Sequence, residues 1–361
     1  MRKYIFLTLI ILVISNLHLL SAEHKPLAAF KIDSLWYVID EQGKTILDPV
    51  ELKSIRAYTE GFYLVTLDYE GKEKFGFMTN TGQVAVMNFD EVRPFRMGMA
   101  VVGKDKEVAK DSIIRYFGYI NNQGQMIVKP KYLEAFDFYD SLAWVMNFDE
   151  RGYIDNNGNF VLMFQSHGFG NNFKQGFASF SDTSGRFGFI NKQGKIAFNL
   201  QWDDAGDFVE GRAKVNKMGL YGFIDTAGHL IVKHSYDFAN DFSGGYAFVG
   251  IPSESAYKSL WSLINTSGTR MFDFMYGEVR DFSEGIAAVM LNKKWKYIDP
   301  QNTQIIKGEY DIAESFHDGL AYVYSAENKI NGFINPLGEL ILPIPDEASE
   351  IIDLRTNKKV K

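Results

Sequence analysis

The sequence contains no cysteine, so neither a disulfide framework nor a lipid-modified N-terminal cysteine is available to this protein. A cysteine nucleophile is excluded for the same reason. The sequence also has no Gly-x-Ser-x-Gly elbow, no glycine-rich phosphate loop with a lysine and no His-Glu-x-x-His pair. Stability must therefore come from packing, and no familiar catalytic motif points to an enzyme.

Excess positive charge is absent as well, because the formal net charge is −7 at pH 7. An acidic chain has no electrostatic attraction for phosphate backbones, so nucleic acid is not expected as a partner. Between residues 26 and 345 no stretch of useful length has the apolar spacing of an amphipathic helix. Aromatic residues and glycine are abundant instead, with 30 Phe, 19 Tyr and 32 Gly, and they favour strands and tight turns. The composition therefore predicts an all-β fold.

The N-terminus has the features of a signal peptide. Arg2 and Lys3 precede an apolar run over residues 4–20, and the small residues Ser21 and Ala22 follow it. Polar residues inside the run and the small-residue exit favour cleavage after about Ala22 over an uncleaved membrane anchor. Cleavage removes two cations and no acid, so the formal charge goes from −7 to −9. We therefore expect a periplasmic or secreted protein.

Most of the chain consists of copies of one pattern. It begins with an aromatic-Gly-aromatic-Ile strand and a turn, and continues through an Asp-x-Ala-x-x-Phe segment to a Gly-x-Ala-x-Val strand. Four residues after each strand stands a glycine, or Asn302 in one copy, as a turn with positive φ requires. The nine strands start 34 to 42 residues apart, which indicates a repeat architecture. They lie at residues 36–39, 75–78, 117–120, 151–154, 187–190, 221–224, 261–264, 295–298 and 331–334.

When the nine copies are aligned, their shared positions, or columns, resemble the pattern of the WG-repeat family, also called KWG repeats. The resemblance extends from about Leu27 to Ile351. The segments at residues 236–239 and 310–313 match the family's Tyr-Asp-x-Ala pattern closely, although no Trp-Gly dipeptide occurs in the chain. The resemblance implies a β-rich bacterial repeat protein that is often exported. It brings no catalytic residues.

Because the repeated strand is apolar on both faces, each unit must be covered on both sides by its neighbours. We expect nine tandem β-meander repeats of about 34–42 residues, stacked as an open curved solenoid. A closed, propeller-like ring is the alternative. The open stack is favoured because both ends fit complete units: Ala28 and Phe30 open the array, while Asp346, Ala348 and Ile351 fit the Asp, Ala and Phe columns at its end.

The expected organisation of the chain has three parts. These are a signal peptide at residues 1–22, the repeat array at 26–351 and a frayed polar tail at 352–361.

One column of the repeat holds an acid in five copies, at Asp90, Asp203, Asp237, Asp311 and Asp346. A short acid beside a turn commonly accepts hydrogen bonds from local amides, and this structural role is the favoured one. We therefore predict a non-catalytic scaffold that binds a protein or a cell-envelope glycan, without cofactor, metal ion or catalytic residue. The alternative is a carbohydrate-active hydrolase that uses carboxylates on one rim.

Two connections, at residues 103–116 and 250–260, are longer than the repeat requires. Extra residues in a repeat array collect as loops, often on the binding face. The two loops therefore supply the candidate binding residues, which are Lys104, Lys106, Arg115, Tyr116, Tyr257 and Lys258.

Overall fold

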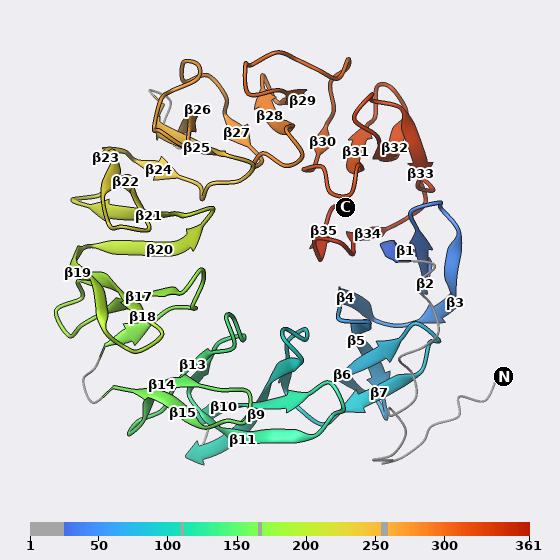
Figure 1. Ribbon diagram of the computed structural model, residues 1–361. Coiled ribbons are helices and arrows are strands. Elements are labelled where there is room, and N and C mark those ends of the chain that lie inside the picture. The colour runs from blue at the N-terminus through green and yellow to red at the C-terminus, as the bar shows by residue number, and fades with distance from the viewer. Residues whose placement is uncertain (1–24, 110–111, 165–167, 254–258) are drawn as a thin grey trace.

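The computed structural model describes residues 25–109, 112–164, 168–253 and 259–361, and these form a ring of nine antiparallel sheets (Figure 1). Each sheet is one blade of a β-propeller, and the blades follow one another round the ring in chain order. The all-β fold with nine units is confirmed. The expected open solenoid is wrong, and the closed ring, the alternative, is the fold. The predicted signal peptide lies outside the described residues.

The blades have three to five strands each. The first contains β1 (Pro26–Ile32), β2 (Leu35–Asp40), β3 (Thr45–Glu51), β34 (Glu350–Asp353) and β35 (Lys358–Lys359). The second contains β4 (Ser54–Thr59), β5 (Phe62–Tyr69), β6 (Lys72–Thr79) and β7 (Val84–Met87). The third contains β8 (Glu91–Val92), β9 (Met99–Ala109), β10 (Ser112–Asn121) and β11 (Met126–Tyr132).

The next three blades have four strands each. The fourth contains β12 (Glu134–Ala135), β13 (Ala143–Met146), β14 (Arg151–Ile154) and β15 (Phe160–Met163). The fifth contains β16 (Phe169–Gly170), β17 (Phe177–Ser181), β18 (Phe187–Asn191) and β19 (Ile196–Trp202). The sixth contains β20 (Asp204–Val209), β21 (Arg212–Lys217), β22 (Leu220–Asp225) and β23 (Leu230–Tyr236).

The last three blades complete the circle. The seventh contains β24 (Phe238–Ala239), β25 (Tyr246–Pro252) and β26 (Ser259–Asn265), and the eighth contains β27 (Glu278–Val279), β28 (Ala287–Leu291) and β29 (Lys294–Ile298). The ninth contains β30 (Ile312–Ala313), β31 (Ala321–Ser325), β32 (Ile330–Ile334) and β33 (Leu340–Pro343). No helix in the described ranges is long and apolar enough to cross a bilayer.

The glycine in the repeated aromatic-Gly strand makes room for backbone. A Cβ atom on Gly118 would lie 2.2 Å from the carbonyl oxygen of Val128, and one on Gly188 would lie 2.5 Å from that of Phe198. In both blades the outer strand shifts register beside the glycine. The column therefore holds glycine because the outer strand bulges toward it, where any side chain would collide.

Two aromatic columns of the sequence meet at the junctions between blades. The second aromatic residue of the repeated strand contacts the phenylalanine of the next blade's Asp-x-Ala-x-x-Phe segment, with ring centroids 4.3 to 5.2 Å apart. Such pairs add about 0.5–1.5 kcal/mol each beyond the area they bury. Six junctions share this contact: Phe77–Phe95, Tyr119–Phe138, Tyr153–Phe173, Phe189–Phe208, Phe223–Phe242 and Tyr297–Phe316.

A polar contact also links successive blades. Glu60 adopts positive φ in the turn between β4 and β5, and its carboxylate accepts a hydrogen bond from the amide of Gly98 in the next blade at 3.0 Å. Glu284 binds the amide of Gly319 in the same way at 3.1 Å. Each such turn therefore fixes the position of the turn that follows it round the ring.

The ring is closed by both ends of the chain. β34 pairs with β1, so that Ile351 faces Phe30, and the first blade is built from residues at the two termini. The amide of Ser349 donates to Lys31 O, as that of Asp90 donates to Gly103 O. Ser349 and Ile351 therefore occupy the Asp and Ala columns. The assignment of Asp346 and Ala348 to these columns from the sequence was wrong by three residues. This copy of the pattern is degenerate, and only strand pairing reveals its register.

The last ten residues are not a frayed tail. Ile352, Leu354 and Val360 are buried, and β35 pairs with β34 on the inner side of the ring (Figure 1). The side chains of Arg355 and Asp353 are only 8% and 2% exposed and form an ion pair with Nη2 and Oδ2 2.6 Å apart.

Contacts to both neighbouring blades hold this C-terminal segment in place. Arg355 Nη1 donates to the carbonyl oxygens of His317 and Leu320 in the ninth blade. On the other side, Asn357 Oδ1 accepts a hydrogen bond from the amide of Tyr58 in the second blade at 2.7 Å. The segment therefore connects the first blade to both of its neighbours.

Replacing Arg355 by alanine should open this closure. The substitution leaves the Asp353 carboxylate buried without its cation, which costs about 3–5 kcal/mol. We expect a large fall in the midpoint of urea unfolding, followed by tryptophan fluorescence. Lys359→Ala is the control, because the Lys359–Glu350 pair is solvent-exposed and its loss should cost less than about 1 kcal/mol. Equal midpoints for the two variants would contradict the closing role of Arg355.

Candidate functional site

The first long connection, predicted as a loop at residues 103–116, is a β-hairpin instead. β9 and β10 continue past the other strands of the third blade, with Lys104 facing Tyr116 and Asp105 facing Arg115. The prediction of a loop was wrong because the length of a connection does not distinguish a loop from two strands that extend beyond their neighbours. The added residues therefore extend the middle of one blade.

The second long connection, at residues 250–260, is also partly strand. Gly250 faces Trp261 and Pro252 faces Ser259 across β25 and β26. The predicted binding residues Tyr257 and Lys258 lie outside the described residues. The site is therefore developed at the third blade.

A surface hollow of about 430 Å³ lies where the second and third blades meet, close to the β9–β10 hairpin. Its volume falls within the usual range for small-ligand sites. A second hollow, of about 440 Å³ between the first and second blades, has Asp48 as its one charged lining residue. The first hollow is distinguished by three arginines. Its lining consists of Arg56, Ala57, Leu64, Phe75, Asp90, Glu91, Val92, Arg93, Pro94 and Arg115.

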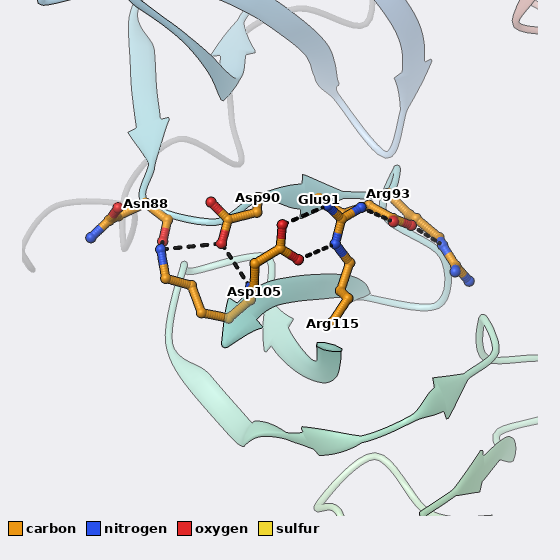
Figure 2. Close-up of polar contacts among 7 residues, drawn as sticks. Asn88, Asp90, Glu91, Arg93, Asp105 and Arg115 are labelled. Carbon is orange, nitrogen blue, oxygen red and sulfur yellow. Dashed lines mark hydrogen bonds and ion pairs between the residues drawn. The ribbon is translucent and has the colours of Figure 1, made fainter. Parts of the chain in front are cut away.

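Carboxylates hold two of the three arginines (Figure 2). Arg115 binds Asp105 through two parallel contacts, Nε to Oδ1 at 2.6 Å and Nη2 to Oδ2 at 2.9 Å. Its Nη1 atom donates to Glu91 Oε2 at 3.0 Å, while the other Glu91 oxygen accepts from Arg93 Nε at 3.1 Å. Arg93 also donates to Ala135 O in the fourth blade at 2.9 Å. The network therefore fixes both guanidinium groups before any ligand arrives.

The protonation states follow from this geometry. The hydrogen bonds from Arg115 lower the pKa of the Asp105 carboxyl below its usual value. The hydrogen bonds to Asp105 and Glu91 raise the pKa of Arg115 above its already high value. The pair is therefore ionised throughout the physiological range.

Arg56 is in a different situation. Its guanidinium carbon lies 5.3 Å from the centre of the Phe75 ring, and the side chain is exposed. No carboxylate of the described residues lies within ion-pair distance of it. An arginine stacked on a ring and not neutralised by an acid is suited to bind an anionic group of a ligand.

Acids of the Asp column accept hydrogen bonds from amides of their own blades, and two of them also pair with a cation of the preceding blade: Asp203 with Arg186 and Asp311 with Lys294. Asp90 Oδ2 accepts from the amide of Asp105 at 2.8 Å and lies 3.4 Å from Lys104 Nζ. Asp203 and Asp311 bind the equivalent amides at 2.6 Å and 2.9 Å. The prediction that acids of this column accept hydrogen bonds from local amides is confirmed for these three. At Asp237 the equivalent residue is Pro252, which has no amide hydrogen to donate.

The predicted site residues divide between the faces of the hairpin. Arg115 lines the hollow, and Lys104 contacts Asp90 at its margin. Lys104, Lys106 and Tyr116 belong to the opposite face from Arg115, because side chains alternate along a strand and Lys104 pairs with Tyr116. Arg56 was not among the binding residues predicted from the sequence. A signal was available, because an arginine directly follows the Ala column in three copies, at Arg56, Arg93 and Arg280.

Comparison with known proteins identifies the repeat. A family model described as the WG containing repeat matches six segments that together cover more than half of the chain, at residues 38–70, 117–147, 187–221, 221–251, 261–295 and 297–325. No curated protein matches the chain in sequence.

Solved structures show only weak likeness. BamB from Moraxella catarrhalis has a TM-score of 0.44 and 13% identity, over 82% of this chain and 97% of that one. The uncharacterized protein lmo1340 from Listeria monocytogenes EGD-e has a TM-score of 0.41 and 11% identity, over 86% and 93%. The ring of nine blades therefore rests on the strand pairing itself.

Replacing Arg115 by glutamine should raise the pKa of Asp105 toward its usual value. Because the folded-state pKa is lowered, the pair stabilises the hairpin at neutral pH, and this contribution is lost as pH falls through that pKa. The titration is measured on the side-chain carboxyl carbons by NMR. Asp182 is the control, because Ser184 lowers its pKa on another blade, and it should not respond. An unchanged Asp105 titration would refute the pairing.

Proposed function

This chain belongs to the family of proteins built from the WG containing repeat, and we propose that it is an exported, non-catalytic binding scaffold. Its partner is a protein or a cell-envelope glycan that carries an anionic group. The hollow between the second and third blades is the contact site. The repeat family and the propeller fold support the scaffold role, whereas the choice of site rests on the arginines.

One observation carries this proposal. Three arginines line the hollow, of which two are immobilised by Asp105 and Glu91, while Arg56 has no ion-pair partner among the residues that the structure describes. Groups that are already ordered lose little conformational entropy on binding, so the site is prepared for a ligand. An anionic group placed against Arg56 would form an ion pair with it and neutralise its charge.

The distribution of carboxylates favours binding over hydrolysis. Glycosidases place two carboxyl groups about 5–10 Å apart on either side of the bond they cleave. Here the acids of the Asp column stand one to a blade, and Asp90, Asp203 and Asp311 are occupied by amides. Burial raises the pKa of Asp137 and of Asp281, as a general acid requires, but these belong to the fourth and eighth blades, which are well separated in Figure 1.

Reversing the charge of Arg56 should weaken partner capture strongly. Mature protein carrying Arg56→Glu is immobilised and exposed to envelope extract of the producing bacterium, and bound proteins and glycans are identified by mass spectrometry. We expect the principal partner to fall by about tenfold relative to the wild type, because the variant repels an anionic group.

Arg270→Glu provides the matched control. Arg270 also lies 5.3 Å from a phenylalanine ring, that of Phe274, but on another blade and beside Asp273. Capture should be unaffected by this change. Equal capture by the two variants, or turnover of a glycan by the wild-type protein, would overturn the proposal.

Export is proposed from the N-terminal pattern, and the start of the ring supports it. β1, the first strand of the described residues, begins at Pro26, so cleavage after about Ala22 would leave all the described strands in the mature chain. The intact mass of the protein in the periplasmic or secreted fraction should correspond to a chain that begins near residue 23. Replacing the small residue Ala22 by arginine should block processing. Unprocessed wild-type protein in the cytosol would contradict this assignment.

A further inference from the structure

The β9–β10 hairpin has one open edge. β9 pairs with β10 from Ser112 to Asn121, whereas β11 pairs with β10 only from Phe117 onward. In the described part of the chain, no strand pairs with residues 112–116 on the side away from β9. This segment therefore lies beyond the end of β11, with one side uncovered.

The pairing shows which backbone groups face that side. Gly103 O accepts a hydrogen bond from the amide of Asp90, which directly precedes β8, so the backbone groups of Gly103 face away from β10. Those of Phe117, the residue paired with Gly103, therefore face away from β9 and toward β11. The side to which a residue's backbone amide and carbonyl point alternates along a strand. Those of Arg115 and Ile113, two and four residues before Phe117, therefore point to the same side as those of Phe117. Their two amides and two carbonyls are thus presented where β11 has already ended.

The other edge of the hairpin is protected against strand addition. The amide of Asp105 donates to Asp90 Oδ2 at 2.8 Å, and the residues of β9 from Lys104 to Glu107 are all charged. Charged side chains and occupied amides are the usual protection of edge strands. The corresponding extension of β6 in the second blade, before Phe75, is also charged throughout, with Lys72, Glu73 and Lys74.

The open edge has neither kind of protection. Residues 112–116 read Ser-Ile-Ile-Arg-Tyr, and the side chain of Ile113 is 68% exposed. The one charge in this segment, on Arg115, is engaged by Asp105 and Glu91. β-branched residues with free backbone groups form a template for another strand.

We propose that residues 112–116 bind an extended segment of a protein partner, which adds to β10 as a further strand in line with β11. The inference rests on the proposed scaffold function and selects protein over glycan as the partner. Polypeptide carries alternating donors and acceptors at the strand spacing of about 3.3 Å per residue, and a glycan does not. A second copy of this chain is disfavoured as the occupant, because five residues bury far less area than a stable dimer requires.

The test uses random twelve-residue peptides displayed on phage and selected against the mature protein. Recovered peptides are synthesised and titrated by fluorescence anisotropy. Ile113→Pro removes an outward amide without removing a bond to β9 and should weaken binding at least about tenfold. Ile113→Val keeps the amide and should change the affinity less than about threefold. Methylation of those alternate backbone nitrogens of the peptide that face β10 should abolish binding, because it removes the amides that donate to β10.

Several results would overturn the inference. They are failure to recover any peptide, equal affinity for Ile113→Pro and the wild type, and indifference to N-methylation. Concentration-dependent dimerisation that Ile113→Pro abolishes would assign the edge to a second copy instead. If Ile113→Pro lowers the melting temperature, Ile113→Lys, which places a charge on the edge, replaces it with the same tenfold threshold.

The inference can fail without the scaffold function failing. A partner captured from envelope extract by both the wild type and Ile113→Pro, but lost with Arg56→Glu, would refute strand addition and retain the scaffold. A partner unaffected by Arg56→Glu but lost with Ile113→Pro would support strand addition and refute the hollow as the contact site.

Discussion

The pairing of β1 with β34 is the interaction on which the rest of the structure depends. Every blade has apolar side chains on both faces, so an open stack would expose one face at each end. Pairing of the termini removes both ends. Leu27 and Phe30 pack with Tyr322 and Phe333 of the ninth blade, and the opposite face of the first blade packs against the second. Each blade thereby gains two neighbours.

The closed ring is a repeated frame that leaves variation to few places. Aromatic pairs such as Tyr119–Phe138 and turn contacts such as Glu60–Gly98 recur round the circle, so they define architecture more than function. The Asp column shows how the same frame supports a site. Asp90 binds the hairpin amide of Asp105 as its counterparts do in other blades, and Asp105 in turn binds Arg115. A structural acid therefore positions the arginine network beside the hollow.

Local physics explains which features could be predicted from the sequence. Turn glycines must adopt positive φ, and strand residues alternate between faces, so strands, turns and the number of units were all readable. The prediction of a loop at residues 103–116 was wrong because connection length does not distinguish a loop from an extended hairpin. Arg56 and Arg115 could not be associated from the sequence, because they belong to different blades and meet only across a junction.

The sequence by itself determined the all-β class, the count of nine repeats and the structural role of Asp90, Asp203 and Asp311. Each of these depends on interactions within one repeat, which its own residues encode. Only the tertiary structure decided that the array closes, that Ile351 and not Ala348 occupies the Ala column, and that one edge of β10 has no partner among the described strands. Those features depend on pairing between distant segments, and a repeat pattern contains the same local information whether its ends meet or remain apart.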